Sequence, residues 1–278
     1  MNDYSQAVNT ARDYYNSEDA DAFYATIWGG EDIHIGLYES LDESITDASR
    51  RTVEHMATKL TGIGRGDRVL DVGSGYGGAA RHLAKSLGCR VSALNLSEVE
   101  NARARELTAE QGLDELVEVI DGSFEAIPFG AETFDAVWSQ DAILHSGNRD
   151  RVLAEVARVM KPGARFVFTD PMQADDCPDG VLEPILSRIH LETLGSPSYY
   201  ERAATEVGLR LIDFENLTHQ LCRHYQRVLD ETSRREGDLE GTVSAAYIDR
   251  MKRGLRHWID GGRRGHLAWG VFLFEKAA

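Results

Sequence analysis

The sequence predicts an α/β fold with a seven-stranded, mostly parallel sheet and helices on both of its faces. Two observations predict it. From Arg68 onward, short β-branched and apolar runs alternate with segments of helical periodicity, and a glycine-rich loop directly follows the first run. Alternating strands and helices form a parallel sheet that the helices cover. The 278 residues, 42% of them hydrophobic, are enough for one such core with additional segments.

Five strands and three helices are expected in the central part of the chain. The strands are residues 68–73, 90–95, 117–121, 134–139 and 164–170, and the helices are residues 77–87, 97–111 and 149–160. At the second helix, Ser97 is the expected N-cap, and Glu100, three residues later, completes a capping box. Lys161, Pro162 and Gly163 end the third helix.

The flanking segments do not follow this alternation. We expect helices at 3–15, 20–27, 43–60, 177–194, 198–207 and 219–261, the last broken around 237–241, and two further strands at 209–214 and 266–275. These two strands bring the sheet to seven. We predict a helical N-terminal cap over residues 1–65, an α/β core over 66–170, and lid helices with C-terminal strands of the same domain over 171–278. The cap and the inserts then form a lid over the carboxyl edge of the sheet, where ligands of such folds bind.

The composition excludes several classes of partner. Thirty Lys and Arg against 46 Asp and Glu give a formal charge of −16, which repels nucleic acid and anionic membranes. This acidity fits either ordinary solubility or adaptation to high salt. The three cysteines have no metal-binding or disulfide spacing, so no metal is expected. The N-terminus lacks a signal peptide pattern, so we expect a cytoplasmic protein without a membrane partner. Whether it is a monomer or a homo-oligomer stays open.

The glycine loop fits two nucleotide-binding patterns. Gly73, Gly75 and Gly78 match the GxGxxG pattern of dinucleotide-binding enzymes. Asp71 with Gly73, Gly75 and Gly77 matches the DxGxGxG loop with which class I methyltransferases bind S-adenosylmethionine. A nicotinamide enzyme needs an acidic residue about 20 residues downstream, whereas the second strand ends in Asn95. This favours the methyltransferase pattern over an oxidoreductase, and a plain strand-to-helix turn is the remaining alternative.

The ends of the third and fourth strands carry further candidate side chains. Asp121, Gly122, Ser123 and Phe124 follow the third strand, where they can read the amino edge of an adenine and stack on its ring. The fourth strand leads into residues 138–145, which emerge over the centre of the carboxyl edge. Among these, Gln140 and Asp141 can also simply cap the next turn, and His145 can be a structural histidine.

Five segments together resemble the glycine betaine branch of the S-adenosylmethionine-dependent N-methyltransferases, and within it the sarcosine/dimethylglycine N-methyltransferases. These segments are residues 28–38, 71–81, 138–146, 169–172 and 251–262. The resemblance implies a class I methyltransferase fold, S-adenosylmethionine as cofactor with S-adenosylhomocysteine as product, and methylation of sarcosine and/or N,N-dimethylglycine to glycine betaine. The alternatives are a methyltransferase of another small amine or of a lipid, and an NAD-dependent oxidoreductase.

The resemblance also implies roles for individual residues. The cofactor is expected to contact Tyr15, Trp28, Arg51, Gly73, Gly75, Ala79, Asn95, Asp121, Gly122, Ser123 and Gln140, with Arg51 at the methionine carboxylate or, alternatively, an ordinary solvated arginine. The acceptor is expected to contact Trp28, His34, Tyr38, His145, Met172 and Tyr200. His145 is the candidate base, and Gln140 borders the sulfonium. A cation must anchor the acceptor carboxylate, and Arg188, Arg202 and Arg223 remain unranked candidates. Trp28, Tyr38, Tyr199 and Tyr200 are candidates for an aromatic cage around the methylated nitrogen.

Overall fold

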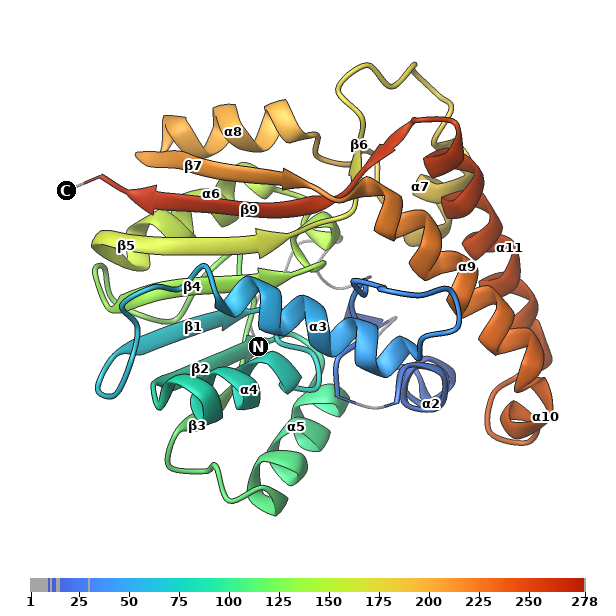
Figure 1. Cartoon of the computed structure of the whole chain (residues 1–278), viewed down its shortest axis with the longest axis horizontal. Helices are drawn as coiled ribbons and strands as arrows, with labels where there is room; N and C mark the ends of the chain where they lie inside the picture. The colour runs from blue at the N-terminus through green and yellow to red at the C-terminus, as the bar shows by residue number, and fades with distance from the viewer. Residues whose placement is uncertain (1–9, 11, 14–15, 30, 278) are drawn as a thin grey trace.

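The computed structural model describes residues 10, 12–13, 16–29 and 31–277, and its main sheet has the predicted seven strands. Their order is β3-β2-β1-β4-β5-β9-β7 (Figure 1). The strands are β1 (Arg68–Val72), β2 (Arg90–Asn95), β3 (Val117–Asp121), β4 (Phe134–Gln140), β5 (Met160–Thr169), β7 (Leu209–Asn216) and β9 (Gly270–Lys276). Strand β9 is antiparallel to both of its neighbours, β5 and β7, and all other neighbouring strands are parallel to each other. The predicted α/β fold class is therefore confirmed.

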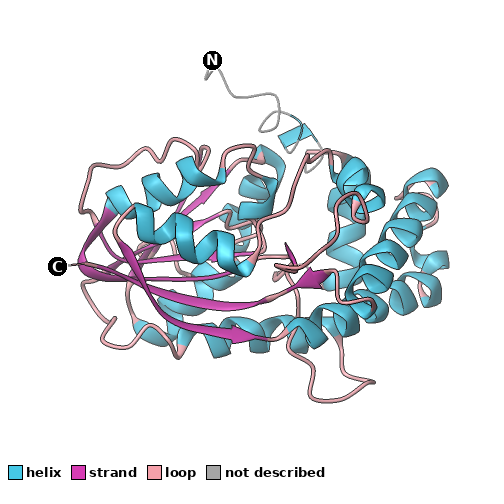
Figure 2. Cartoon of the chain, turned by 90° about the horizontal axis from the view of Figure 1, so that it is seen from above, coloured by secondary structure: helices cyan, strands magenta, loops and turns pink. Residues whose placement is uncertain are grey.

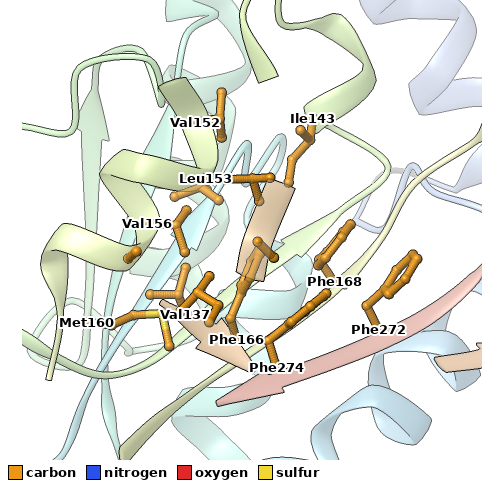
Figure 3. Packing of buried hydrophobic residues seen from close by; sticks show 14 of the residues in the cluster. Val137, Ile143, Val152, Leu153, Val156, Met160, Phe166, Phe168, Phe272 and Phe274 are labelled. Atoms are coloured by element: carbon orange, nitrogen blue, oxygen red, sulfur yellow. The ribbon is translucent and has the colours of Figure 1, made fainter. Parts of the chain in front are cut away.

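Helices cover both faces of this sheet. One face packs against α6 (Arg149–Val159) and α8 (Pro197–Glu206), and the other against α3 (Ile45–Ala57) and α4 (Gly78–Leu87). Figure 3 shows Val152 and Val156 of α6 in the same apolar cluster as Val137 of β4 and Phe166 of β5. Helix α5 (Glu98–Glu110) lies along the β3 edge. Because helices cover both faces, β4 is buried along almost its whole length, as expected of a central strand.

A second group of helices gathers beyond the carboxyl ends of the parallel strands (Figures 1 and 2). It consists of α2 (Glu18–Trp28), α7 (Glu183–Ile189), α9 (Thr218–Arg234), α10 (Glu236–Leu239) and α11 (Ala245–Arg263). Phe23 of α2 packs among apolar side chains of α9 and α11, including Tyr247 and Met251. The short strands β6 (Met172–Gln173) and β8 (Leu267–Ala268) pair beside them, and a 3-10 turn, η1 (Ile143–His145), follows β4.

Three predicted elements differ from the observed ones. Strand β5, predicted at 164–170, begins at Met160 and includes the residues predicted to end the preceding helix. The helix expected at 177–194 is only α7, because Gly180 adopts a positive φ before it and His190 ends it in the left-handed conformation. The strand expected at 266–275 is interrupted at Trp269, which separates β8 from β9. Most of the helix expected at 3–15 lies outside the described residues. The division of the chain at residues 66 and 171 stays a prediction.

The segment between α2 and α3 is fastened to α9 by a buried histidine. The Nδ1 atom of His224 accepts hydrogen bonds from the backbone N–H of Gly36, at 3.2 Å, and from the Tyr38 hydroxyl, at 2.9 Å. Burial, followed by the charge of nearby His34, lowers the pKa of His224 to about 3. The folded chain therefore holds this imidazole neutral at any pH above that value.

We expect His224→Asn to lose less stability at low pH than at neutral pH. Asn keeps an acceptor near Nδ1 but does not titrate. In the unfolded chain His224 binds a proton below a pH of about 6.5, while in the folded chain it does not, so its stabilising contribution falls as the pH drops. The difference in unfolding free energy between the two proteins should shrink by about 1.4 kcal/mol per pH unit below 6.5. Urea denaturation at pH 7.5, 6.0 and 5.0 measures this, and a pH-independent difference would contradict it.

Candidate active site

The glycine loop between β1 and α4 has a backbone that only glycine adopts without strain. Gly73, Gly75 and Gly77 have φ angles of 78°, 51° and 73°, all in the left-handed region. A Cβ atom at Gly73 would also collide with the Cβ of Ala142. The loop therefore leaves room for a ligand to approach its backbone, and it borders a cleft with about 920 Å³ of empty space.

Several polar atoms in this cleft are buried and lack a hydrogen-bond partner within the described part of the chain. They are Asp32 Oδ1, both ring nitrogens of His34, Asp71 Oδ2, Ser74 Oγ and Gln140 Nε2, all on residues that line the cleft. Buried polar groups are almost always paired in native proteins. The cleft therefore fits a ligand that offers both hydrogen-bond donors and acceptors.

Two carboxylates give the cleft its electrostatic character. Burial, followed by the nearby charge of Asp32, raises the pKa of Asp71 to about 8. Burial also raises the pKa of Asp32, but the imidazole of His34, 3.7 Å from Asp32 Oδ1, and the charges of Arg50 and Arg81 outweigh it, so that the pKa is lowered overall. Arg50 lies 2.7 Å from Asp32 Oδ2. A cationic group in the cleft would therefore favour ionisation of Asp71.

At the end of β2, a buried amide and a buried carboxyl group lie side by side. The Nδ2 atom of Asn95 donates to Glu100 Oε2 at 2.9 Å, and both residues line the cleft. Burial raises the pKa of Glu100 to about 7, against the lowering effect of Asn95. Ser97 caps α5 as predicted, by accepting from the backbone N–H of Glu100. The capping box is incomplete, however, because the Glu100 carboxyl group accepts from Asn95.

At the end of β4, the chain makes a strained turn that joins three parts of the fold. Asp141 has a φ of 50°, which is uncommon outside glycine. Its Oδ2 accepts from the backbone N–H of Ile35 at 2.7 Å, and its Oδ1 accepts from the indole N–H of Trp269 at 2.8 Å. Burial raises the pKa of Asp141, partly offset by His34 and these hydrogen bonds. Asp141 therefore fixes the 31–38 segment over the sheet edge.

A second cavity, also with about 920 Å³ of empty space, adjoins the cleft. Ile33, His34, Asp141 and His145 line both. The second cavity has a continuous row of aromatic rings, with centroid separations of 5.1 to 5.6 Å between neighbours. In order, the rings are Tyr24, Trp28, His224, Tyr225 and Trp258. We call this row the aromatic wall, and the space that it borders the aromatic cavity.

His145 stands between the two spaces. It lies in η1, and burial, followed by the charges of Arg149 and Arg188, lowers its pKa to about 4. Its imidazole is therefore neutral at pH 7. A neutral imidazole between a ligand cleft and an aromatic cavity can accept a proton or a hydrogen bond from a group in either space.

The structure brings most of the predicted site residues to these two spaces. Those that line the cleft are His34, Gly73, Gly75, Ala79, Asn95, Ser123, Gln140 and His145. Trp28 lines the aromatic cavity, and Tyr15 lies outside the described residues. Their roles toward a ligand stay predictions.

Six predicted residues are not among those that line either space: Arg51, Asp121, Gly122, Tyr38, Met172 and Tyr200. Arg51 pairs with Glu43 and donates to the carbonyl oxygen of Leu37, which leaves its predicted contact with the methionine carboxylate without geometric support. Asp121 is half exposed and binds Arg105 at 2.6 Å. Gly122 is buried against Leu94.

The other three are held in the interior. The buried Tyr38 hydroxyl donates to His224. Tyr200 donates its hydroxyl proton to Asp170 at 2.6 Å, and Met172 packs with it in the sheet core. Large apolar side chains at these positions stabilise the core, so the sequence pattern alone did not distinguish them from lining residues. Tyr199, a cage candidate, donates to Asp150 near the surface.

Several residues that line the two spaces are not predicted from the sequence. Glu100 is predicted only as part of a helix cap, and no role is predicted for Asp32, Tyr24, Tyr225 or Trp258. For Glu100, its position in the first turn of the helix that follows Asn95 was an available signal. For the aromatic residues there was no such signal, because α2, which carries Tyr24, lies about 200 residues before α9 and α11, which carry Tyr225 and Trp258.

Comparisons with known proteins decide the family. A family model for a methyltransferase domain matches residues 70–168. A sarcosine/dimethylglycine N-methyltransferase of Halorhodospira halochloris is 59% identical over 98% of this chain and 97% of that protein. The chain belongs to the sarcosine/dimethylglycine N-methyltransferase family. A relative with the same name from Aphanothece halophytica is 52% identical over 96% of both chains. A solved candidate sarcosine dimethylglycine methyltransferase from Galdieria sulphuraria, 42% identical, superimposes with a TM-score of 0.91 over 95% of this chain and 99% of its own.

Family membership confirms the predicted enzyme class and cofactor. The chain is a class I methyltransferase that uses S-adenosylmethionine, which leaves no place for the nicotinamide alternative. The cleft fits this cofactor, because its unpaired buried atoms include both a donor, Gln140 Nε2, and an acceptor, Asp71 Oδ2. Within the described residues, no helix is long and apolar enough to span a bilayer, and no group of three His, Cys, Asp or Glu side chains is placed to hold a metal ion.

We expect Asp141→Asn to lower stability and to weaken binding of S-adenosylhomocysteine by this methyltransferase. Both partners of the carboxylate, Ile35 and Trp269, are N–H donors. The oxygen of an Asn amide can accept from only one of them, and the amide NH₂ group would face the N–H of the other. The cost should be about 1–3 kcal/mol in unfolding free energy. Asn tolerates a positive φ, so backbone strain does not contribute.

Chemical denaturation and calorimetric titration with S-adenosylhomocysteine test this prediction. The matched control is Asp213→Asn, which removes only an exposed ion pair with Lys59 and should cost less than about 1 kcal/mol. Equal stability and equal affinity in Asp141→Asn and the unmodified enzyme would show that this carboxylate does not fix the 31–38 segment.

Proposed function

We propose that this enzyme methylates the nitrogen of sarcosine and of N,N-dimethylglycine, and that its final product is glycine betaine. The names of its relatives support these acceptors. The observation that carries the proposal is the aromatic cavity, which meets the glycine-loop cleft at His145. Aromatic faces attract a methylated ammonium by about 0.5–2 kcal/mol. The aromatic wall therefore suits both the acceptor and its quaternary product.

We assign the glycine-loop cleft to the cofactor. S-adenosylmethionine, when bound, supplies an electrophilic methyl group on a sulfonium sulfur. Asp71 and Asp32, which line the cleft, would provide negative charge for its cationic groups, and Gln140 would lie beside the sulfonium. Asn95 with Glu100 would bind ribose hydroxyls, and Ser123 with Phe124 would contact the adenine. These residues hold the donor in one orientation, which is most of the catalysis that an in-line transfer needs.

The acceptor nitrogen must offer a lone pair, whereas a free amino acid is mostly an ammonium near neutral pH. His145 is neutral there, because its pKa is about 4, and it lies in both spaces. We propose that its neutral ring nitrogen accepts a hydrogen bond from the acceptor ammonium and relays the proton to solvent without itself becoming charged. Ile33 and Trp28 exclude water around the reacting atoms.

The proposal includes the setting of the reaction. Both reactants are small and water-soluble, so we place the enzyme in the cytoplasm, without a nucleic acid or membrane partner. The formal charge of −16 supports the exclusion of nucleic acid. An osmoprotectant product would also suit an acidic surface adapted to salt.

The acceptors are tested with purified enzyme, labelled S-adenosylmethionine, and glycine, sarcosine or dimethylglycine in turn. We expect sarcosine and dimethylglycine to be methylated and glycine betaine to be identified by mass spectrometry. Gly73→Ala is the control, because its Cβ would collide with Ala142 and strain the loop, so turnover should be lost with every acceptor. Turnover only with an unrelated amine or a lipid would refute the proposed acceptors while leaving the methyltransferase assignment intact.

The role of His145 is tested by the pH dependence of His145→Gln. In the unmodified enzyme, kcat/KM for dimethylglycine should rise from pH 6 to 9 with deprotonation of the acceptor, since His145 titrates only near 4. The variant should keep this shape but lose about 10²- to 10⁴-fold in kcat. Its affinity for S-adenosylhomocysteine and its Tm serve as controls for folding. An unchanged kcat would remove His145 from the mechanism.

A further inference from the structure

The structure ranks the three arginines that were candidates for the acceptor carboxylate. Arg202 on α8 is 66% exposed and pairs with Glu206 at 3.9 Å. Arg223 on α9 donates to the carbonyl oxygen of Tyr38 at 2.9 Å. Arg188 on α7 lines the aromatic cavity, and neither of the other two does. Only Arg188 is therefore placed to reach an acceptor held by the aromatic wall.

The guanidinium of Arg188 has no acidic partner among the described residues, although the chain contains 46 acidic residues. In the part of the chain that the structure describes, its guanidinium makes one hydrogen bond, from Nη2 to the sulfur of Met251 at 2.7 Å. A thioether is a weak acceptor, and a guanidinium carries five N–H donors. Most of these donors are therefore available to a carboxylate in the cavity.

A glycine inside α11 makes room for this side chain. A Cβ atom at Gly254 would collide with Nε, Cδ and Cζ of Arg188, so any other residue there would displace the guanidinium. Gly254 has ordinary helical surroundings and no positive φ that would require glycine. Because glycine is unfavourable within a helix, the clearance for Arg188 is the physical reason that the structure offers for it.

A surface cleft with about 1240 Å³ of empty space lies on the other side of Arg188. It shares Arg188, His190 and Met251 with the aromatic cavity. Arg250 and Arg253 also line this cleft, and its one carboxylate, Asp19, is hydrogen-bonded to Ser244. In a chain of charge −16, this is a locally positive approach to the cavity. A carboxylate that arrives from the surface would meet Arg188 before it meets the aromatic wall.

We propose that Arg188 binds the carboxylate of the acceptor, and so makes the enzyme select amino acids over simple amines. The inference rests on the proposed function. A guanidinium binds a carboxylate through two parallel N–H···O contacts, which fix orientation as well as position. With the carboxylate held at Arg188 and the methylated nitrogen against the aromatic wall, the lone pair is directed toward the boundary with the cofactor cleft. Arg188 is thus a binding residue that sets acceptor specificity.

The test compares Arg188→Met, Arg188→Lys and Gly254→Ala with the control Arg202→Met. Two acceptors are used: dimethylglycine, and N,N-dimethylethanolamine, which has the same amine but a hydroxyl in place of the carboxylate. Binding of S-adenosylhomocysteine is measured by calorimetry, and binding of dimethylglycine is measured in its presence. Gly254→Ala displaces the guanidinium without removing its charge, and Arg202→Met removes an arginine of similar length outside the cavity.

We expect Arg188→Met to raise the KM and the Kd for dimethylglycine by about 10- to 100-fold, the range for a lost hydrogen bond to a charged group. The ratio of kcat/KM between the two acceptors should fall by a similar factor, because the amine without a carboxylate loses nothing. Arg188→Lys and Gly254→Ala should show smaller changes in the same direction. Affinity for S-adenosylhomocysteine should stay within twofold in all variants, and Arg202→Met should match the unmodified enzyme.

Two results would overturn the inference. One is an unchanged acceptor ratio in Arg188→Met, which would place the carboxylate elsewhere. The other is equal loss of S-adenosylhomocysteine binding, which would show that Arg188 supports the fold and not the acceptor. If the unmodified enzyme methylates neither sarcosine nor dimethylglycine, the proposed function fails instead, and this outcome is seen before any variant is made.

Discussion

The pair of hydrogen bonds at Asp141 is the constraint on which the rest of the site depends. One carboxylate at the end of β4 binds the backbone of Ile35 and the indole of Trp269, residues from opposite ends of the chain. Ile35 carries the segment that closes the cleft, and Trp269 separates β8 from the main sheet. The positive φ of Asp141 is the cost of directing both oxygen atoms at once. The cleft and the aromatic cavity share this residue, so neither can move independently of the other.

Burial shapes the chemistry of the same region. Asp71, Glu100 and Asp141 all have raised pKa values because they are removed from water next to the cleft. Burial of ionisable groups destabilises a folded chain, and such groups are concentrated at functional sites, where a bound ligand can offset the loss of hydration. The pKa values of His145 and His224 shift in the opposite direction, because burial lowers them and keeps both rings neutral. The site thus combines acidic groups that a cation would ionise with imidazoles that stay uncharged.

The fold was predictable because its signals are local, whereas much of the site was not. Each central strand has its own apolar run, and the glycine loop is continuous in sequence. The aromatic wall, in contrast, takes Trp28 from α2 and Trp258 from α11, and no local pattern relates them. Tyr38 and Arg51 are residue types that also line ligand sites, but here the Tyr38 hydroxyl is hydrogen-bonded to His224 and Arg51 forms an ion pair with Glu43. Whether such a side chain lines the site depends on its contacts with residues distant in the sequence, and these contacts cannot be derived from a single sequence.

The arrangement also explains how a strongly acidic protein can accept a substrate with a carboxylate. The acceptor is a zwitterion, so its two ends need opposite environments a few ångströms apart. The aromatic wall stabilises the positive end without placing a negative charge in the cavity, where such a charge would repel the carboxylate. Arg188 lines that cavity, where Met251 and Gly254 lie against its side chain and none of the described acidic residues pairs with it. Of the charged groups that line the cavity, the Asp141 carboxylate is already hydrogen-bonded to Ile35 and Trp269, so the neutral wall and Arg188 determine which acceptors fit.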